Sequence, residues 1–384
     1  MHKVTILAGA VVALVAAGCS ATGDNAPDLV IADGAGIVVA AADGSRAERI
    51  GTLTGPSSAF QPTWSPDGAF IAWTEVFDGP GDLIITSADG TSSERLKRTT
   101  RPYYMSWDPA GGRVVTLRDR DGGGILVELV TTDGTSVEID DGAPYYFAWD
   151  PDGGRYLLHV GVDRVELVEP QGETMIVDDA TGVFQAPAWG AAGRLYLRAG
   201  STGQTLVLDD GTGPREVARV AGGAQMVAAG NRVAIQAFGG DQGNGQQVVF
   251  QQIPRIDAGA VQVFDLADGS ITEVIDDAAG AFFWSPDGER LLLLEGVDFG
   301  TARWLVWEDG EITTYPEFGL EPTWITTFLP FFDQYATSMT LWSQDGSAFA
   351  YPALVDGASR IFVQGVTDAE PADIGDGSWV AWRP

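Results

Sequence analysis

A short motif of tryptophan, proline, aspartate and glycine returns along the chain roughly every 40 residues. It constrains the fold more than any other feature. The intact form, Trp-Ser-Pro-Asp-Gly, stands at 64–68 and again at 284–288. Altered copies begin at Trp107, Trp149, Trp189 and Trp342. A chain with such a period is an array of similar units, so the single unit has to be interpreted first.

Each repeat carries the signals of four short strands. Ser-Pro-Asp-Gly fits the four positions of a β-turn, and apolar runs at 60–64 and 70–74 flank the first copy. A third run at 83–86 closes on Asp-Gly, a hairpin signal, and a more polar run follows at 94–98. The repeat is therefore predicted to be an antiparallel β-propeller blade. The recurring tryptophan is expected to fill the space between blades.

The repeats predict an all-β chain with eight blades; seven is the alternative if the degenerate repeat at 225–276 merges with a neighbour. The last anchor, Trp382, has no strands after it, whereas residues 28–53 offer three strands with no anchor before them. We predict that 378–383 forms the inner strand of a composite blade with those strands, which removes open sheet edges. Residues 28–384 would then form one propeller domain.

The first residues carry the pattern of an export signal. Val4 to Ala17 is apolar, is too short for a comfortable membrane span, and leads to small residues before Cys19, the only cysteine. This pattern resembles the lipobox of bacterial lipoproteins, with Ala16 where leucine is usual. The resemblance implies a signal peptide at 1–18, a lipid on Cys19 and a tether over 19–27. The protein would be held at a cell membrane, in the periplasm or on the cell surface. Ordinary signal cleavage nearby is the alternative.

Charge and composition exclude several functions. The formal net charge is −31, which disfavours nucleic acid as a partner. With two histidines and one cysteine, a His/Cys zinc site is excluded. His159 is expected to be a sheet residue. The acidic loops at 78–82 and 119–122 lack the ligand series of a known calcium loop. No catalytic residue, metal ligand or cofactor is predicted.

Two long insertions explain the wider spacing before the anchors at 284 and 342. Strand direction places both on the face that carries the second–third loops and the links between blades. Long loops in compact domains are commonly functional, so we predict that this face binds the partner. One insertion spans 239–259 and the other 317–334. The candidate contact residues are Gln246, Gln251, Phe318, Trp324, Phe328, Phe331 and Phe332. The alternative is that the aromatic side chains fold down and plug the ring.

At 64–68 and 284–288 the chain resembles the TolB-like propeller repeats, relatives of the WD40 class. The resemblance extends from about Asp28 onward; it implies the fold and says little about activity. The first hypothesis is a monomeric, lipid-anchored binding or scaffold protein of the cell envelope. Its partner would be an unknown envelope protein or a small ligand. The alternative is a propeller enzyme, a hydrolase or lyase, that uses carboxylates in the central funnel, although no pair of acids stands out.

Overall fold

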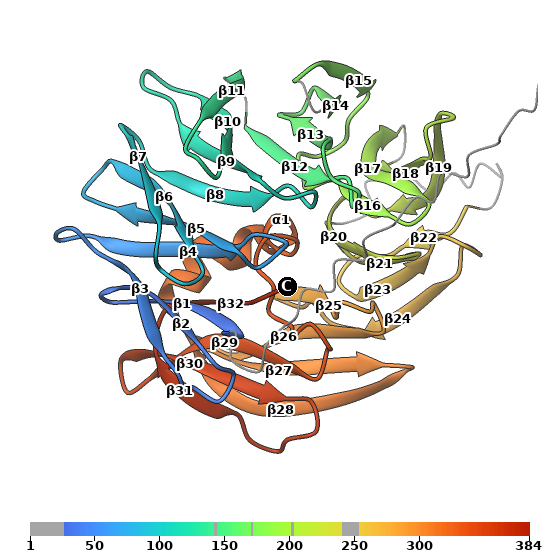
Figure 1. Ribbon diagram of the computed structural model, residues 1–384. Helices are drawn as coiled ribbons and strands as arrows, with labels where there is room; N and C mark the ends of the chain where they lie inside the picture. Colours follow the sequence, from blue (N-terminus) through green and yellow to red (C-terminus); the bar gives the residue numbers. More distant parts are fainter. Residues whose placement is uncertain (1–26, 142–143, 170–171, 201–202, 240–252) are drawn as a thin grey trace, which may run out of the picture.

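Four-stranded antiparallel sheets are arranged around a central axis in the computed structural model (Figure 1). The structure describes residues 27–141, 144–169, 172–200, 203–239 and 253–384. Six of its sheets are single blades, and one seven-stranded sheet holds two blades. Those two are joined where Gly319 pairs with Leu354 and Leu320 with Ala353. The all-β propeller is confirmed, with eight blades.

The first four blades follow the chain order, each counted from its inner strand outward. Blade 1 contains β32 (Trp379–Trp382), β1 (Leu29–Asp33), β2 (Gly36–Ala40) and β3 (Glu48–Thr52). Blade 2 contains β4 (Ser58–Trp64), β5 (Phe70–Val76), β6 (Gly81–Ser87) and β7 (Ser93–Arg98). Blade 3 contains β8 (Pro102–Trp107), β9 (Arg113–Asp119), β10 (Ile125–Thr131) and β11 (Ser136–Asp141). Blade 4 contains β12 (Tyr145–Trp149), β13 (Tyr156–Val160), β14 (Arg164–Val168) and β15 (Thr174–Asp178).

The second half of the ring is less regular. Blade 5 contains β16 (Ala188–Gly190), β17 (Gly193–Gly200), β18 (Gly203–Asp209) and β19 (Pro214–Val220), with β22 (Arg255–Ile256) added in parallel to β19. Blade 6 contains β20 (Gly223–Ala229), β21 (Arg232–Phe238), β23 (Val261–Asp265) and β24 (Ile271–Ile275). Blade 7 contains β25 (Ala281–Trp284), β26 (Arg290–Asp298), β27 (Thr301–Glu308) and β28 (Glu311–Leu320). Blade 8 contains β29 (Ala348–Val355), β30 (Ala358–Gly365) and β31 (Ala372–Asp376), and the segment at Trp342 bridges to Phe349 on its inner side.

The ring closes through the composite blade that the repeat count predicts. The inner strand β32 pairs antiparallel with β1, with Val380 opposite Ile31 and Trp382 opposite Leu29. All four of these side chains are buried. The two ends of the domain therefore belong to one sheet, and the predicted closure is confirmed.

The repeated Ser-Pro-Asp-Gly segment forms the tight turn between the first two strands. In blade 2 the Gly68 N–H donates to the Ser65 carbonyl at 2.8 Å, and Gly68 has a φ of 63° that favours glycine. The Asp67 carboxylate accepts from the Ser65 hydroxyl at 2.6 Å and from the Ala69 N–H at 3.0 Å. Blades 7 and 8 repeat these bonds at Ser285 and Ser343. Ser65, Asp67 and Gly68 thus each have a defined part in the turn.

The repeated tryptophans pack between blades and also bond them together. The Trp107 indole N–H donates to the Thr63 carbonyl of the preceding inner strand at 3.0 Å. Six of the eight junctions have the same bond, at 2.9–3.3 Å; the donors are Trp64, Trp107, Trp149, Trp189, Trp284 and Trp342. The junction of blades 5 and 6 lacks a tryptophan and instead has an Ala191 N–H to Gly230 carbonyl bond at 2.7 Å.

The two faces of the ring differ. The turn face carries the tight first–second and third–fourth turns, and the insertion face carries the second–third loops and the links between blades. The described residues include twelve exposed large hydrophobic side chains. Four of them lie on outermost strands, and eight lie at the insertion face: Val162, Val183, Phe238, Val297, Phe299, Ile325, Phe331 and Val355. In the described part of the chain no helix is long and apolar enough to span a bilayer.

Candidate functional site

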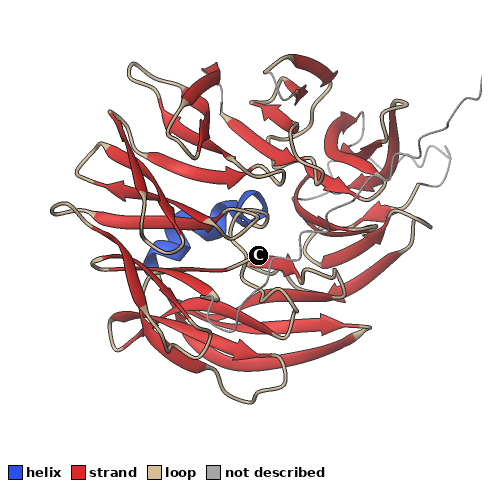
Figure 2. Cartoon of the chain, in the orientation of Figure 1, coloured by secondary structure: helices blue, strands red, loops and turns tan. Residues whose placement is uncertain are grey.

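The link from blade 7 to blade 8 folds into three short helical turns near the centre of the ring (Figure 2). A π-helix covers Trp324–Phe328, a 3₁₀ turn covers Leu329–Phe331, and α1 covers Phe332–Tyr335. The buried Glu321 carboxylate begins this segment and accepts from the Trp324 N–H at 2.9 Å and from the Ser359 hydroxyl at 3.0 Å. The inserted segment thus begins after β28, a few residues later than the predicted start at 317.

Aromatic side chains of this segment fill the middle of the ring. Trp324, Phe328 and Phe332 are fully buried. Phe328 stacks on Trp324 with ring centroids 4.6 Å apart, and Phe332 meets Phe282 of blade 7 edge-on at 4.7 Å. Three of the predicted contact residues are therefore packing residues with no exposed surface. We call residues 321–338 the plug.

The Gln334 side chain fastens the plug to the inner strand of blade 4. Its carbonyl oxygen accepts from the Phe147 N–H at 2.9 Å, and its amide nitrogen donates to the Phe147 carbonyl at 2.8 Å. The side chain thereby pairs with β12 in place of a neighbouring strand. The Tyr104 hydroxyl completes the arrangement, because it donates to the main-chain carbonyl of Gln334 at 2.8 Å and accepts from the Gln334 side-chain amide nitrogen at 2.8 Å.

Tyr335 ties the plug to blades 2 and 3. Its hydroxyl donates to the Tyr103 carbonyl at 2.8 Å and accepts from the Gln61 amide at 2.6 Å. Gln61 occupies a β-bulge in β4 with φ of 52°, a left-handed conformation that is costly for a residue with a side chain. Burial raises the pKa of Tyr335, so its hydroxyl keeps its proton.

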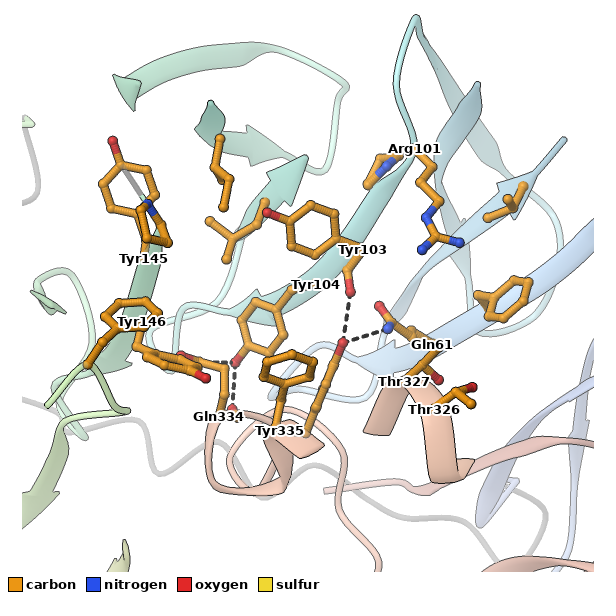
Figure 3. Close-up of a pocket in the computed structure, with 18 residues that line it drawn as sticks. Gln61, Arg101, Tyr103, Tyr104, Tyr145, Tyr146, Thr326, Thr327, Gln334 and Tyr335 are labelled. Atoms are coloured by element: carbon orange, nitrogen blue, oxygen red, sulfur yellow. Dashed lines mark hydrogen bonds between the residues drawn. The ribbon is translucent and has the colours of Figure 1, made fainter. Parts of the chain in front are cut away.

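A pocket of about 340 Å³ opens between the plug and blades 2 to 4, at the insertion face. Eight of its eighteen lining residues are aromatic, which makes it predominantly apolar (Figure 3). Its lining residues are Phe60, Gln61, Val76, Arg101, Pro102, Tyr103, Tyr104, Leu117, Ile125, Pro144, Tyr145, Tyr146, Phe184, Thr326, Thr327, Phe331, Gln334 and Tyr335. We call this cavity the aromatic pocket; its volume lies in the range of small-ligand sites.

Arg101 is the one charged residue among the described residues that line the aromatic pocket. Arg101 is exposed at the start of β8, and in the described part of the chain no carboxylate lies within ion-pair distance of it. Burial raises the pKa of Tyr103 and of Tyr146, so both phenols are neutral. Among the described residues that line the pocket, none is an aspartate or glutamate. The arrangement supports recognition of a bound molecule and provides no carboxylate pair for acid–base chemistry.

The other predicted residues lie in several places. Phe331 lines the aromatic pocket and is 45% exposed, so it remains a candidate contact residue. Phe318 belongs to β28 and stacks on Trp304 at 6.0 Å. Gln246, Gln251 and Cys19 fall outside the described residues.

His159 is a buried sheet residue, as expected. Its Nδ1 lies 2.8 Å from the Gln185 carbonyl, and burial lowers the pKa of the imidazole. Among the residues that the structure describes, no three histidine, cysteine or acidic side chains lie close enough to hold a metal ion.

Sequence reasoning missed the aromatic pocket itself, although a signal was present. Pro-Tyr-Tyr stands at 102–104 and again at 144–146, each time beginning five residues before a tryptophan anchor. Both copies begin an inner strand at the insertion face, and all six residues line the pocket. Two adjacent blades thus present the same aromatic pair to one cavity.

Comparison with known proteins supports the fold alone. No protein-family model and no curated protein matches the chain. A solved structure described as the eukaryotic initiation factor is similar at 10% identity, covering 93% of this chain and 98% of that one, with a TM-score of 0.56. The β-propeller domain of the Trilobed protease from Pyrococcus furiosus is similar at 10% identity over 84% and 98%, with a TM-score of 0.51. TolB from Acinetobacter baumannii is similar at 12% identity over 80% of each chain, with a TM-score of 0.41.

Proposed function

We propose that this protein is a lipid-anchored binding protein of the cell envelope, whose insertion face receives a small ligand or a partner. The aromatic pocket is the observation that carries this proposal. It is concave and largely apolar, and it has a few polar groups at fixed positions, which are the usual properties of a ligand site. Gln334 and Tyr335 of the plug hold the pocket walls in place through hydrogen bonds to blades 2, 3 and 4. Because its walls are preformed, little ordering cost accompanies binding.

The position of the first described strand indicates the orientation that such an anchor would give the ring. β1 is the second strand of its blade, so it begins at the turn face. Pro27 and Asp28 border a groove there together with Ser343 and Asp345 of a tight turn. A lipid on Cys19 would hold the turn face toward the membrane and leave the aromatic pocket facing away from it. Replacing Cys19 by alanine is expected to abolish incorporation of radiolabelled palmitate; equal labelling of both proteins would contradict the anchor.

The proposed function is tested by blocking the pocket. Thr326 lines the pocket and is exposed, so Thr326→Trp fills the cavity at little cost to the fold. Compounds from a small-molecule library that raise the melting temperature of the wild-type protein are expected to have no effect on this variant. The matched control is Thr313→Trp on the outer strand β28, which should respond like the wild type. The proposal fails if the stabilising compounds act equally on Thr326→Trp.

A further inference from the structure

We propose that the aromatic pocket binds a flat aromatic molecule that bears a carboxylate and a hydrogen-bond donor. Arg101 would hold the carboxylate, and the side-chain oxygen of Gln61 would accept from the donor. This inference rests on the proposed function and adds the chemical class of its ligand.

The hydrogen-bond network fixes which atom Gln61 offers to the pocket. The Tyr103 carbonyl can only accept, so the Tyr335 hydroxyl uses its single proton there. The Gln61 amide nitrogen must then be the donor to Tyr335. Its Oε1 is left buried, with no hydrogen-bond donor among the described residues. Gln61 lines the pocket and is 6% exposed, and its Oε1 has almost no accessible surface of its own. A small shift of the Gln61 side chain would bring this oxygen to a ligand N–H or O–H, which would then satisfy it.

The second polar group is Arg101. Figure 3 shows its side chain extending from the start of β8 toward the part of the pocket where Gln61 lies. A guanidinium without a carboxylate partner offers a planar set of donors that suits a carboxylate. The two groups therefore specify an acid and a donor on one ligand.

The aromatic side chains set the shape of the remaining part of the ligand. Tyr146 and Phe184 stack with ring centroids 4.4 Å apart, and Tyr104 and Tyr335 meet at 5.0 Å. Flat rings present their faces and edges to a flat ligand at low cost in side-chain entropy. A cavity of about 340 Å³ accommodates one or two fused rings with a short acidic arm.

The protein's net charge of −31 repels an anionic ligand, but this repulsion is weaker than the contact with Arg101. The Debye length at physiological ionic strength is about 8 Å, so acids dispersed over the surface are largely screened. A guanidinium in direct contact with the carboxylate is not screened in that way. Arg101 therefore determines the preference for a carboxylate, and the net charge of the protein mainly lowers the association rate of the ligand.

Isothermal titration of the full-length protein with three probes tests this assignment. Indole-3-acetate has the ring, the acid and the N–H; indole-3-acetamide lacks the charge; 1-methylindole-3-acetate lacks the donor. Indole-3-acetate is expected to bind about tenfold or more tightly than the amide, and several-fold more tightly than the methylated acid. Arg101→Gln should lower the affinity for indole-3-acetate by about tenfold and leave the affinity for indole-3-acetamide unchanged. Arg215→Gln, on the outer strand β19, is the matched control and should change neither affinity.

The outcomes separate the ligand class from the site. Equal affinity for acid and amide, or equal loss of both in Arg101→Gln, would overturn the assignment of Arg101. Naphthalene serves as a fourth probe, without charge or hydrogen-bond donor. If it binds and Thr326→Trp abolishes that binding, while neither acid binds, the ligand class is overturned but the pocket remains the binding site. Circular dichroism and melting temperature verify that each variant is folded.

Discussion

At the scale of single residues, the indole N–H of the repeated tryptophan does more than occupy space. Trp107→Phe keeps most of the buried area but removes the bond to the Thr63 carbonyl. We expect a loss of about 1–2 kcal/mol in the free energy of unfolding, measured by urea denaturation. Trp382→Phe is the control, because the buried Trp382 indole nitrogen has no partner among the described residues. Equal losses at both positions would show that packing alone accounts for the tryptophan.

Asp333 gives the plug a dependence on pH. Burial raises the pKa of its carboxyl to about 7, although N–H groups of Gln334, Gln225 and Ala186 act in the opposite direction. Between about pH 4 and 7 the folded protein holds a proton that the unfolded chain releases, so stability falls as the pH rises. Asp333→Asn should melt like the wild type near pH 4. At pH 8 it should be more stable by on the order of 1–4 kcal/mol.

An exposed aspartate provides the control of opposite sign. Hydrogen bonds from Ser87 and Thr91 lower the pKa of Asp89 to about 2, so its contribution is present above pH 4 and is lost in acid. Asp89→Asn should therefore be slightly less stable than the wild type at pH 8. A pH profile of melting temperature that is unchanged in Asp333→Asn would contradict the buried, proton-binding carboxyl.

At the scale of elements, the plug is expected to be part of the core. Phe328 is fully buried, whereas Phe331, three residues on, is 45% exposed. Phe328→Ala should cost about 3–5 kcal/mol in the free energy of unfolding, and Phe331→Ala about 1 kcal/mol or less. Deleting 318–332 should likewise unfold the protein, because it removes the buried Trp324, Phe328 and Phe332. Similar small losses for both alanine variants would place the segment outside the core.

The regular elements could be predicted because their turns leave a sequence signature. Ser65, Asp67 and Gly68 each satisfy a specific demand of the turn, so the same residues recur and mark the strands on either side. The plug leaves no such signature. Its helical turns are too short for a hydrophobic period, and its π-helix and 3₁₀ turn are set by packing against inner strands. Gln61 could not be identified either, since its role depends on Tyr335, which lies 274 residues further along the chain.

At the scale of the whole molecule, the ring depends on the pairing of its two ends. Ile31 and Val380 lie opposite each other on neighbouring antiparallel strands, where Cα atoms are about 4.5–5.5 Å apart. This separation suits a disulfide. In a Cys19→Ala background, Ile31→Cys with Val380→Cys should therefore cross-link under oxidation, as a shift on non-reducing electrophoresis. The cross-link should raise the melting temperature, because it closes a very long loop in the unfolded chain.

The matched control uses the next strand. Val38 on β2 is the partner of Ile31, so it lies two strands from Val380, about 10 Å away. Val38→Cys with Val380→Cys should then remain reduced under the same conditions, because that distance exceeds the reach of a disulfide. Both pairs contain the same cysteine at 380, so a difference between them reports which strand lies next to β32 and which residue lies opposite position 380. If the Val38 pair cross-links as readily as the Ile31 pair, β32 does not occupy the inner edge of β1, and the blade that closes the ring is assembled differently.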